Sequence, residues 1–216
     1  MHQGDFIDEN GHKKGVYHIN VVDEITQWEI VGSVEAISER FLQPLLEDLL
    51  NQFPFVIKNF HSDNGSEYVN KVVSKLLNKL LIKQTKSRPR QCNDNALAET
   101  KNGGVIRKHM GYQYIDQKHA KKINLFYREY FNPYLNFHRP SGFATIKIDR
   151  RGKIKKVYDL YQTPFEALKS HSGISTFLKA GITIQRLEKI SLEMSDNDAA
   201  KRMKRAKQQL FTSVQS

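Results

Sequence analysis

Strand-like and helix-like patterns of hydrophobic positions alternate along the first part of the chain. Apolar runs rich in β-branched and aromatic residues predict strands, and these cover residues 15–22, 26–31, 53–60 and 81–84. Apolar positions at helical spacing predict amphipathic helices over residues 37–49, where Pro44 should introduce a kink, and over residues 69–80. With a first strand ahead of a turn at residues 8–11, the order β-β-β-α-β-α-β-α predicts a mixed sheet with helices on both faces.

The second part of the chain has a different pattern. An aromatic-rich stretch from about residue 118 to residue 136 predicts a helix, which Pro133 should interrupt. A basic segment then surrounds Gly152, and its turn residues predict a hairpin-like linker over residues 147–158.

A further helix should begin near Thr163, because Thr163 and Glu166 have the spacing of a capping box with proline at the first helical position. The chain beyond Ser195 predicts a basic helix. We therefore expect a core over residues 1–145, followed by a basic linker and helical C-terminal extension over residues 146–216.

Charge narrows the class of partner. The chain has 34 Lys and Arg against 23 Asp and Glu, a net charge of +11. Such an excess favours a polyanionic partner, since cationic side chains that neutralise phosphates supply most sequence-independent affinity for nucleic acid. A ribosome or an anionic membrane surface would also suit this charge. No apolar run approaches the length of a membrane helix, and the single Cys92 excludes an internal disulfide and a Cys-rich zinc site. We expect a cytoplasmic protein.

Two carboxylates are the candidate catalytic groups. Asp63 follows an apolar strand-like run, Glu99 lies in a predicted helix, and 35 residues, 64 to 98, separate them. Taken singly, each has an ordinary explanation, because Asp-Asn-Gly favours a turn and Glu is a common helix former. Taken together, an acid at a strand end and an acid on a helix can hold a divalent metal ion over a phosphodiester.

The helix that carries Glu99 has an unusual face. At about 100° per residue, Asn95, Asn102, Gly103 and Ile106 share the face of Glu99, which is small and largely polar. Two adjacent glycines, 103 and 104, would each cost roughly 1 kcal/mol in a helix. Either a neighbour approaches the backbone closely there, or the helix ends at this pair.

These segments resemble the catalytic core of retroviral-type integrases and insertion-sequence transposases, the DDE group. The matching pieces are residues 17–28, 62–68, 93–107 and 134–140, so the resemblance covers roughly residues 1–145. It implies an α/β fold with a ribonuclease H-like mixed sheet flanked by helices. It also implies that Asp63 and Glu99 hold Mg²⁺ or Mn²⁺ for two-metal phosphoryl transfer. The DNA substrates would be element ends and a target, and the active species a homo-oligomer on DNA.

The pattern of the family also contains a third acid, on the first strand. In relatives with the His-Gln-Gly-Asp opening, this acid stands in an Ile-Asp-Thr segment just ahead of it, whereas this sequence begins at Met1. By position Asp5 is the best remaining candidate, with Asp8 behind it and Asp23 better explained as a strand-end residue. We expect an N-terminally truncated copy. Three interpretations stay open: a transferase, an inactive DNA-binding fragment, and a ribonuclease H-like nuclease that cuts without joining.

Basic residues near Glu99 are candidate phosphate contacts. The angle count places Arg107 nearer to the acid face, while Lys101 and Lys108 point away from it and could instead be solvated. For the basic tail, a solvated face and a DNA contact are both open.

Overall fold

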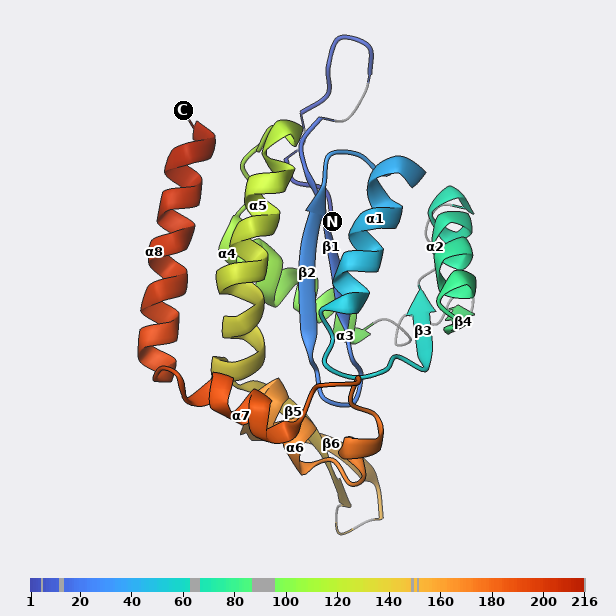
Figure 1. Ribbon diagram of the computed structural model, residues 1–216, viewed down its shortest axis with the longest axis vertical. Coiled ribbons are helices and arrows are strands. Elements are labelled where there is room, and N and C mark those ends of the chain that lie inside the picture. The colour runs from blue at the N-terminus through green and yellow to red at the C-terminus, as the bar shows by residue number, and fades with distance from the viewer. Residues whose placement is uncertain are drawn as a thin grey trace.

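The computed structural model shows a mixed α/β fold, in agreement with the predicted class (Figure 1). It describes residues 1–4, 6–11, 14–62, 67–86, 96–148, 150 and 152–215. The strands are β1 Tyr17–Val22, β2 Glu29–Val34, β3 Asn59–Ser62, β4 Lys83–Lys86, β5 Ser141–Ile148 and β6 Ile154–Gln162. The α-helices are α1 Glu39–Asn51, α2 Glu67–Lys79, α3 Ala96–Lys101, α4 Lys108–Met110, α5 Ala120–Phe126, α6 Pro164–Ser170, α7 Ile184–Leu192 and α8 Asp196–Gln215. Turns of π-helix cover Asn102–Arg107, Tyr127–Phe131 and Tyr134–His138, and 3-10 turns cover Gln117–His119 and Ile174–Thr176.

The strands of the described residues form three separate pairs. β1 and β2 are antiparallel, with Tyr17 opposite Val34, whereas β3 and β4 are parallel, with Asn59 opposite Lys83. β5 and β6 form an antiparallel ribbon. The described backbone pairings do not join these pairs into the predicted single mixed sheet, so the ribonuclease H-like arrangement stays a prediction.

The free edge of β1 is partly occupied by the first residues of the chain. The Gln3 amide donates to the Val16 carbonyl at 2.9 Å, and the His18 amide donates to the Met1 carbonyl at 2.7 Å. The chain then turns at residues 8–11, where the Gly11 amide donates to the Asp8 carbonyl. The predicted turn is thus confirmed.

Asparagine side chains cover the outer edge of β2. The Asn136 amide bonds both backbone groups of Glu29, at 2.8 Å each, and Asn132 bonds those of Val31 at 3.0 and 3.1 Å. Asn124 does the same for Ser33. These side chains satisfy backbone groups that an edge strand would otherwise present to another chain. They fix β1 and β2 against the long helical segment that follows α4.

Two predicted boundaries are wrong. The helical segment continues through Pro133 without interruption, and π-helical turns lie on both sides of the proline. Such turns change the hydrogen-bond pattern locally, so a missing N–H donor is tolerated. The predicted strand over residues 53–60 is also shorter than expected, because Phe53 and Phe55 pack against Trp28 and an isolated bridge to Leu178, not a continuous strand pairing, holds Phe55.

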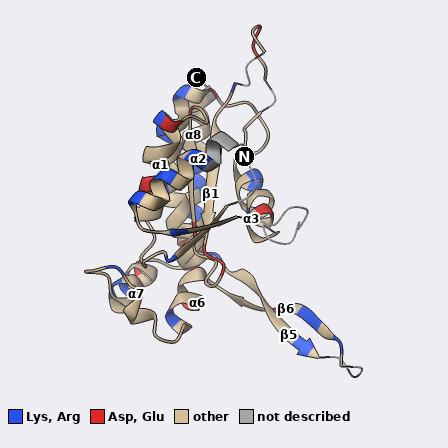
Figure 2. Cartoon of the chain, turned by 90° about the vertical axis from the view of Figure 1, so that its right-hand side faces the viewer, with Lys and Arg blue, Asp and Glu red and all other residues tan. Residues whose placement is uncertain are grey.

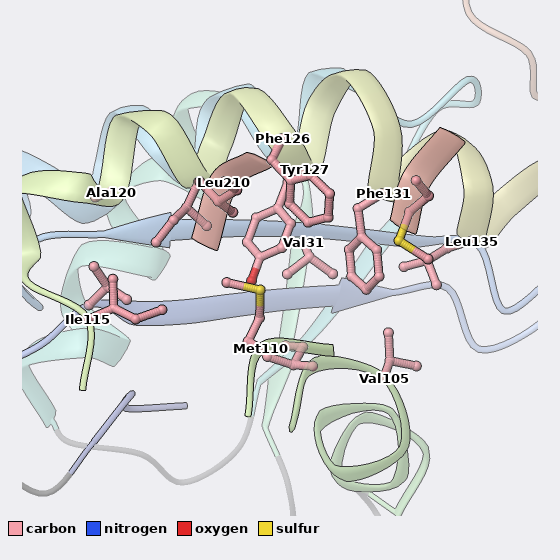
Figure 3. Packing of buried hydrophobic residues seen from close by; sticks show 14 residues of the cluster. Val31, Val105, Met110, Ile115, Ala120, Phe126, Tyr127, Phe131, Leu135 and Leu210 are labelled. Carbon is pink, nitrogen blue, oxygen red and sulfur yellow. The ribbon is translucent and has the colours of Figure 1, made fainter. Parts of the chain in front are cut away.

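Helices from the middle and from the C-terminal part of the chain contribute to the hydrophobic core. Tyr127 and Phe131 lie fully buried between the β1–β2 pair and the helices, next to Met110 (Figure 3). Met203 and Leu210 of α8 close the same cluster. A second cluster joins strands β1 and β2 to α6 and α7. The boundary between a core and an extension at residue 145 stays a prediction.

The buried His18 makes stability depend on pH. His18 is 1% exposed, and its Nδ1 lies 2.8 Å from the Tyr127 hydroxyl in a hydrogen bond. Burial, helped by the positive N-terminus and His2, lowers the pKa of His18 to about 3 from 6.5. On acidification, His18 in the unfolded chain binds a proton at a higher pH than His18 in the folded protein. The contribution of the buried neutral imidazole to stability is therefore complete above pH 6.5 and decreases as the pH falls towards 3.

Lowering the pH from 7 to 5 should therefore reduce the free energy of unfolding by about 2 kcal/mol through His18 alone. Urea denaturation of the wild-type protein and of His18→Gln at both pH values measures this difference, since every other titrating group is common to both. If the two proteins lost equal stability on acidification, His18 would not be buried in its neutral form.

Candidate active site

Glu99 lies in the first turn of α3, and its side chain is exposed. A carboxylate in this position interacts favourably with the positive end of the helix dipole. Asp63 immediately follows Ser62, the last residue of β3, but Asp63 itself and Asp5 lie outside the described residues. Their approach to Glu99 stays a prediction.

A cavity of about 440 Å³ is lined by the end of β1 and its following turn, by residues between 53 and 61 that reach into β3, by residues between 168 and 177, and by one residue of α3. Ala98, the neighbour of Glu99, lines it from α3, and His61, two positions before Asp63, lines it from β3. The end of β1 and the following turn contribute Asn20 and Asp23. The segments that carry the two candidate acids therefore border the same cavity.

Side chains at the end of β3 hold it against β4. His61 Nδ1 and the Thr85 hydroxyl are 3.0 Å apart, and the Gln84 side-chain amide donates to the Ser62 hydroxyl at 3.2 Å. Parallel pairing of Ser62 with Lys86 continues to the end of the strand. These contacts fix the backbone that leads into Asp63.

A buried ion pair attaches α3 to the β1–β2 pair. Lys101 Nζ lies 3.6 Å from Glu29 Oε2, and these residues are only 7% and 1% exposed. The Asn20 amide donates to Glu29 Oε1 at 2.9 Å, and Lys101 donates to the Ser141 hydroxyl at 3.0 Å. Burial raises the pKa of Glu29 and lowers the pKa of Lys101, while the charge of each partner opposes the effect on the other.

This ion pair corrects one sequence interpretation of Lys101. The solvated alternative is wrong, because the ammonium group is buried and neutralised inside the protein. Arg107 and Lys108, in contrast, are exposed on the continuation of the same helix. The Arg107 guanidinium lies over the Tyr112 ring, 5.5 Å from its centre. Phosphate contact by Arg107, Lys108 or Lys101 stays a prediction.

The helix does not end at Gly103 and Gly104. It continues as π-helix to Arg107, so the alternative that the pair breaks the helix is wrong. A Cβ atom at either glycine would meet nothing within 4 Å in the described part of this chain, so no close neighbour explains them there. Ile106 is fully buried rather than on a polar face, because π-helical turns depart from the 100° spacing of an α-helix.

The remaining acidic candidates have structural partners in turns. Asp23 Oδ2 accepts hydrogen bonds of 2.7 Å from both the backbone amide and the hydroxyl of Thr26. Asp8 forms an ion pair of 3.0 Å with Lys14 and accepts a bond from the amide of Asn10. Asp23 thus stabilises the β1–β2 turn, and Asp8 the turn at residues 8–11.

The donor chemistry suits a hard divalent cation. Carboxylate oxygens are the ligands that Mg²⁺ and Mn²⁺ prefer, and the exposed Glu99 carboxylate is accessible to such an ion. Within the ranges that the structure describes, no three His, Cys, Asp or Glu residues group as metal ligands. Glu99 is thus the described member of the proposed set, to which Asp63 would be added.

A known family matches the first part of the chain. The integrase core domain matches residues 1–92, a range that contains Asp63 and ends before Glu99. No curated protein matches the chain. In the described residues, no helix is both long and apolar enough to cross a membrane. The match over residues 1–92, less than half of the chain, supports a catalytic core of the type found in retroviral-type integrases and DDE transposases.

Proposed function

We propose that this protein cleaves the 3′ ends of a mobile DNA element and joins them to target DNA by two-metal phosphoryl transfer. The observation that carries this proposal is the shared cavity, which Ala98 next to Glu99 and His61 near Asp63 both line. The net charge of +11 supports DNA as the substrate. The antiparallel β1–β2 pair and the parallel β3–β4 pair are the two types of strand pairing that a ribonuclease H-like mixed sheet would combine.

In this proposal Asp63 and Glu99 hold Mg²⁺ or Mn²⁺, and Asp5 is the third carboxylate by position. When bound, the ions activate the attacking oxygen and stabilise the leaving oxygen of the phosphodiester. The chain itself supplies the positioning. The ion pair between Lys101 and Glu29 fixes the helix that presents Glu99, and exposed cations such as Arg107 neutralise DNA phosphates.

Two other functions stay in competition. An inactive DNA-binding fragment would account equally for the net charge of +11. A nuclease that cuts without joining would use the same acids. The three functions differ in the DNA products that they form, and this difference can be measured directly.

The test combines a labelled duplex from the DNA flanking the gene with an unlabelled supercoiled plasmid, in Mg²⁺ or Mn²⁺. We expect labelled 3′ ends joined to the plasmid, and no product when EDTA is present. If the duplex were shortened but no joined product formed, the protein would be a nuclease and not a transferase. Retarded but uncut duplex would leave only the DNA-binding function.

A further inference from the structure

The β5–β6 ribbon projects from the rest of the molecule (Figure 2). Its strands contain 8 and 9 residues, and most of their side chains on both faces are exposed. Towards the tip, Ile146, Ile148 and Ile154 are 70%, 69% and 67% exposed. A ribbon with exposed apolar side chains on this scale is typical of a surface that contacts a partner.

The ribbon is strongly basic, and its charges face one another. Lys147 lies directly opposite Lys155 in the strand register, and the neighbouring pair joins Ile146 to Lys156. Arg150 is exposed at the turn. Like charges in opposite positions destabilise a ribbon, although Asp159 offsets part of this by pairing with Lys147. An anionic partner would remove the remaining repulsion.

The two faces of the ribbon differ in chemistry. Because cross-strand partners point to the same face, Ile146, Ile148 and Ile154 share one face with Lys156. Lys147 and Lys155 lie on the other face. Cations are therefore present on both faces, and the isoleucines are concentrated near the tip.

The base of the ribbon is attached beside the candidate active site. Lys101, two residues after Glu99, donates to the hydroxyl of Ser141, the first residue of β5. The Gln27 side-chain amide donates to the Gly142 carbonyl at 2.9 Å. In Figure 2, α3 and the ribbon lie on the same side of the molecule. A duplex bound at Glu99 would thus have the ribbon next to it.

We propose that the β5–β6 ribbon is a DNA-binding arm that lies in a groove of the duplex held at the active site. This inference rests on the proposed function for its substrate class. The major groove, about 12 Å wide, admits a two-stranded ribbon. The lysines and Arg150 bind backbone phosphates along the groove, and the isoleucines at the tip make apolar contacts with bases. A second copy of the chain is a poorer partner for the ribbon, since pairing of the two copies through this surface would bring two basic ribbons together.

The first test replaces three cations of the arm: Arg150→Ala, Lys155→Ala and Lys156→Ala in one variant. A matched control removes equal charge from the exposed face of α2, with Lys71→Ala, Lys75→Ala and Lys79→Ala. Affinity for a labelled duplex is measured in EDTA over a series of salt concentrations. Loss of three phosphate contacts should raise Kd by roughly 10- to 100-fold near 0.15 M salt and reduce the slope of log K against log salt by about 2–3. The control should change Kd by less than about threefold, because its cations would not contact phosphates.

A second variant shortens the arm, with residues 146–156 replaced by an Asn-Gly turn. It keeps the Thr145–Val157 pair and the base of the ribbon, and thermal unfolding checks that it is folded. It should show at least the loss of affinity of the triple variant. Unchanged Kd and salt slope in both arm variants would overturn the proposal, as would an equal loss in the α2 control. Arm variants with normal affinity but a smaller oligomer by sedimentation would assign the arm to a second copy instead.

Because the binding assay contains no metal and requires no chemistry, its result is independent of strand transfer. Failure of the joining reaction with intact arm-dependent binding would reject the proposed activity and retain the arm. Normal joining together with DNA binding that does not depend on the arm would reject the arm and retain the proposed activity.

Discussion

Glu99→Gln should reduce joining of DNA ends by about 10³-fold or more while leaving the protein folded. A metal ligand supplies several kcal/mol of transition-state stabilisation, and each 1.36 kcal/mol corresponds to a factor of ten in rate. Because the Glu99 side chain is exposed in the first turn of α3, its loss should change the free energy of unfolding by less than about 0.5 kcal/mol.

Glu129→Gln is the matched control, since Glu129 is also exposed on a helix and loses the same charge. Initial rates of joined product, measured with both variants at equal concentration, give the comparison. DNA affinity in EDTA should be similar for both, which separates catalysis from binding. If the Glu99→Gln variant joined DNA ends at a rate within about tenfold of the wild-type rate, Glu99 would not be a metal ligand.

Lys101→Ala should cost about 3–5 kcal/mol of stability, because it leaves the Glu29 carboxylate buried and without its partner charge. Glu29 is 1% exposed, and its other described side-chain contact is the amide of Asn20. Replacing both charges, with Lys101→Met and Glu29→Gln, should cost clearly less, since neither group then requires a counter-charge. The two single changes should therefore be strongly non-additive.

Urea unfolding of Lys101→Met, Glu29→Gln and the variant that combines them provides the complete cycle. Lys108→Ala, which removes an exposed lysine from the same helical segment, serves as the control and should stay within about 0.5 kcal/mol of wild type. Additive losses in the double variant would show that Lys101 and Glu29 do not interact.

Local signals in the sequence predicted local structure well. The start of α6 is an example, because Thr163 and Glu166 form the complete capping box that their spacing predicts. The amphipathic helix over residues 69–80 corresponds to α2 for the same reason, since its apolar positions face one side. Both depend on residues only a few positions apart.

Features that depend on distant residues were not predictable in this way. The Lys101–Glu29 pair joins residues 72 positions apart, and neither residue carries a local signal of burial. Phe53 and Phe55 resemble strand residues, but their burial comes from Trp28 and the carboxyl-terminal helices. Pro133 is tolerated because the surrounding π-helical turns adapt.

The sequence predicted which family the core resembles but not how its segments are arranged. The spacing of Asp63 and Glu99 and the surrounding motifs indicated an integrase core, which the family match over residues 1–92 confirms. The shared cavity depends on how β1, β3 and α3 pack, and no sequence pattern describes that packing. The basic hairpin was predicted as a linker, while the structure extends it to a ribbon based at Ser141.

The most direct measurement is anomalous diffraction from crystals of the protein with duplex DNA and Mn²⁺. The account predicts a manganese peak about 2.1 Å from carboxylate oxygens of both Asp63 and Glu99, the distance typical of small hard cations. Manganese bound elsewhere, with these two carboxylates on opposite sides of the molecule, would contradict it.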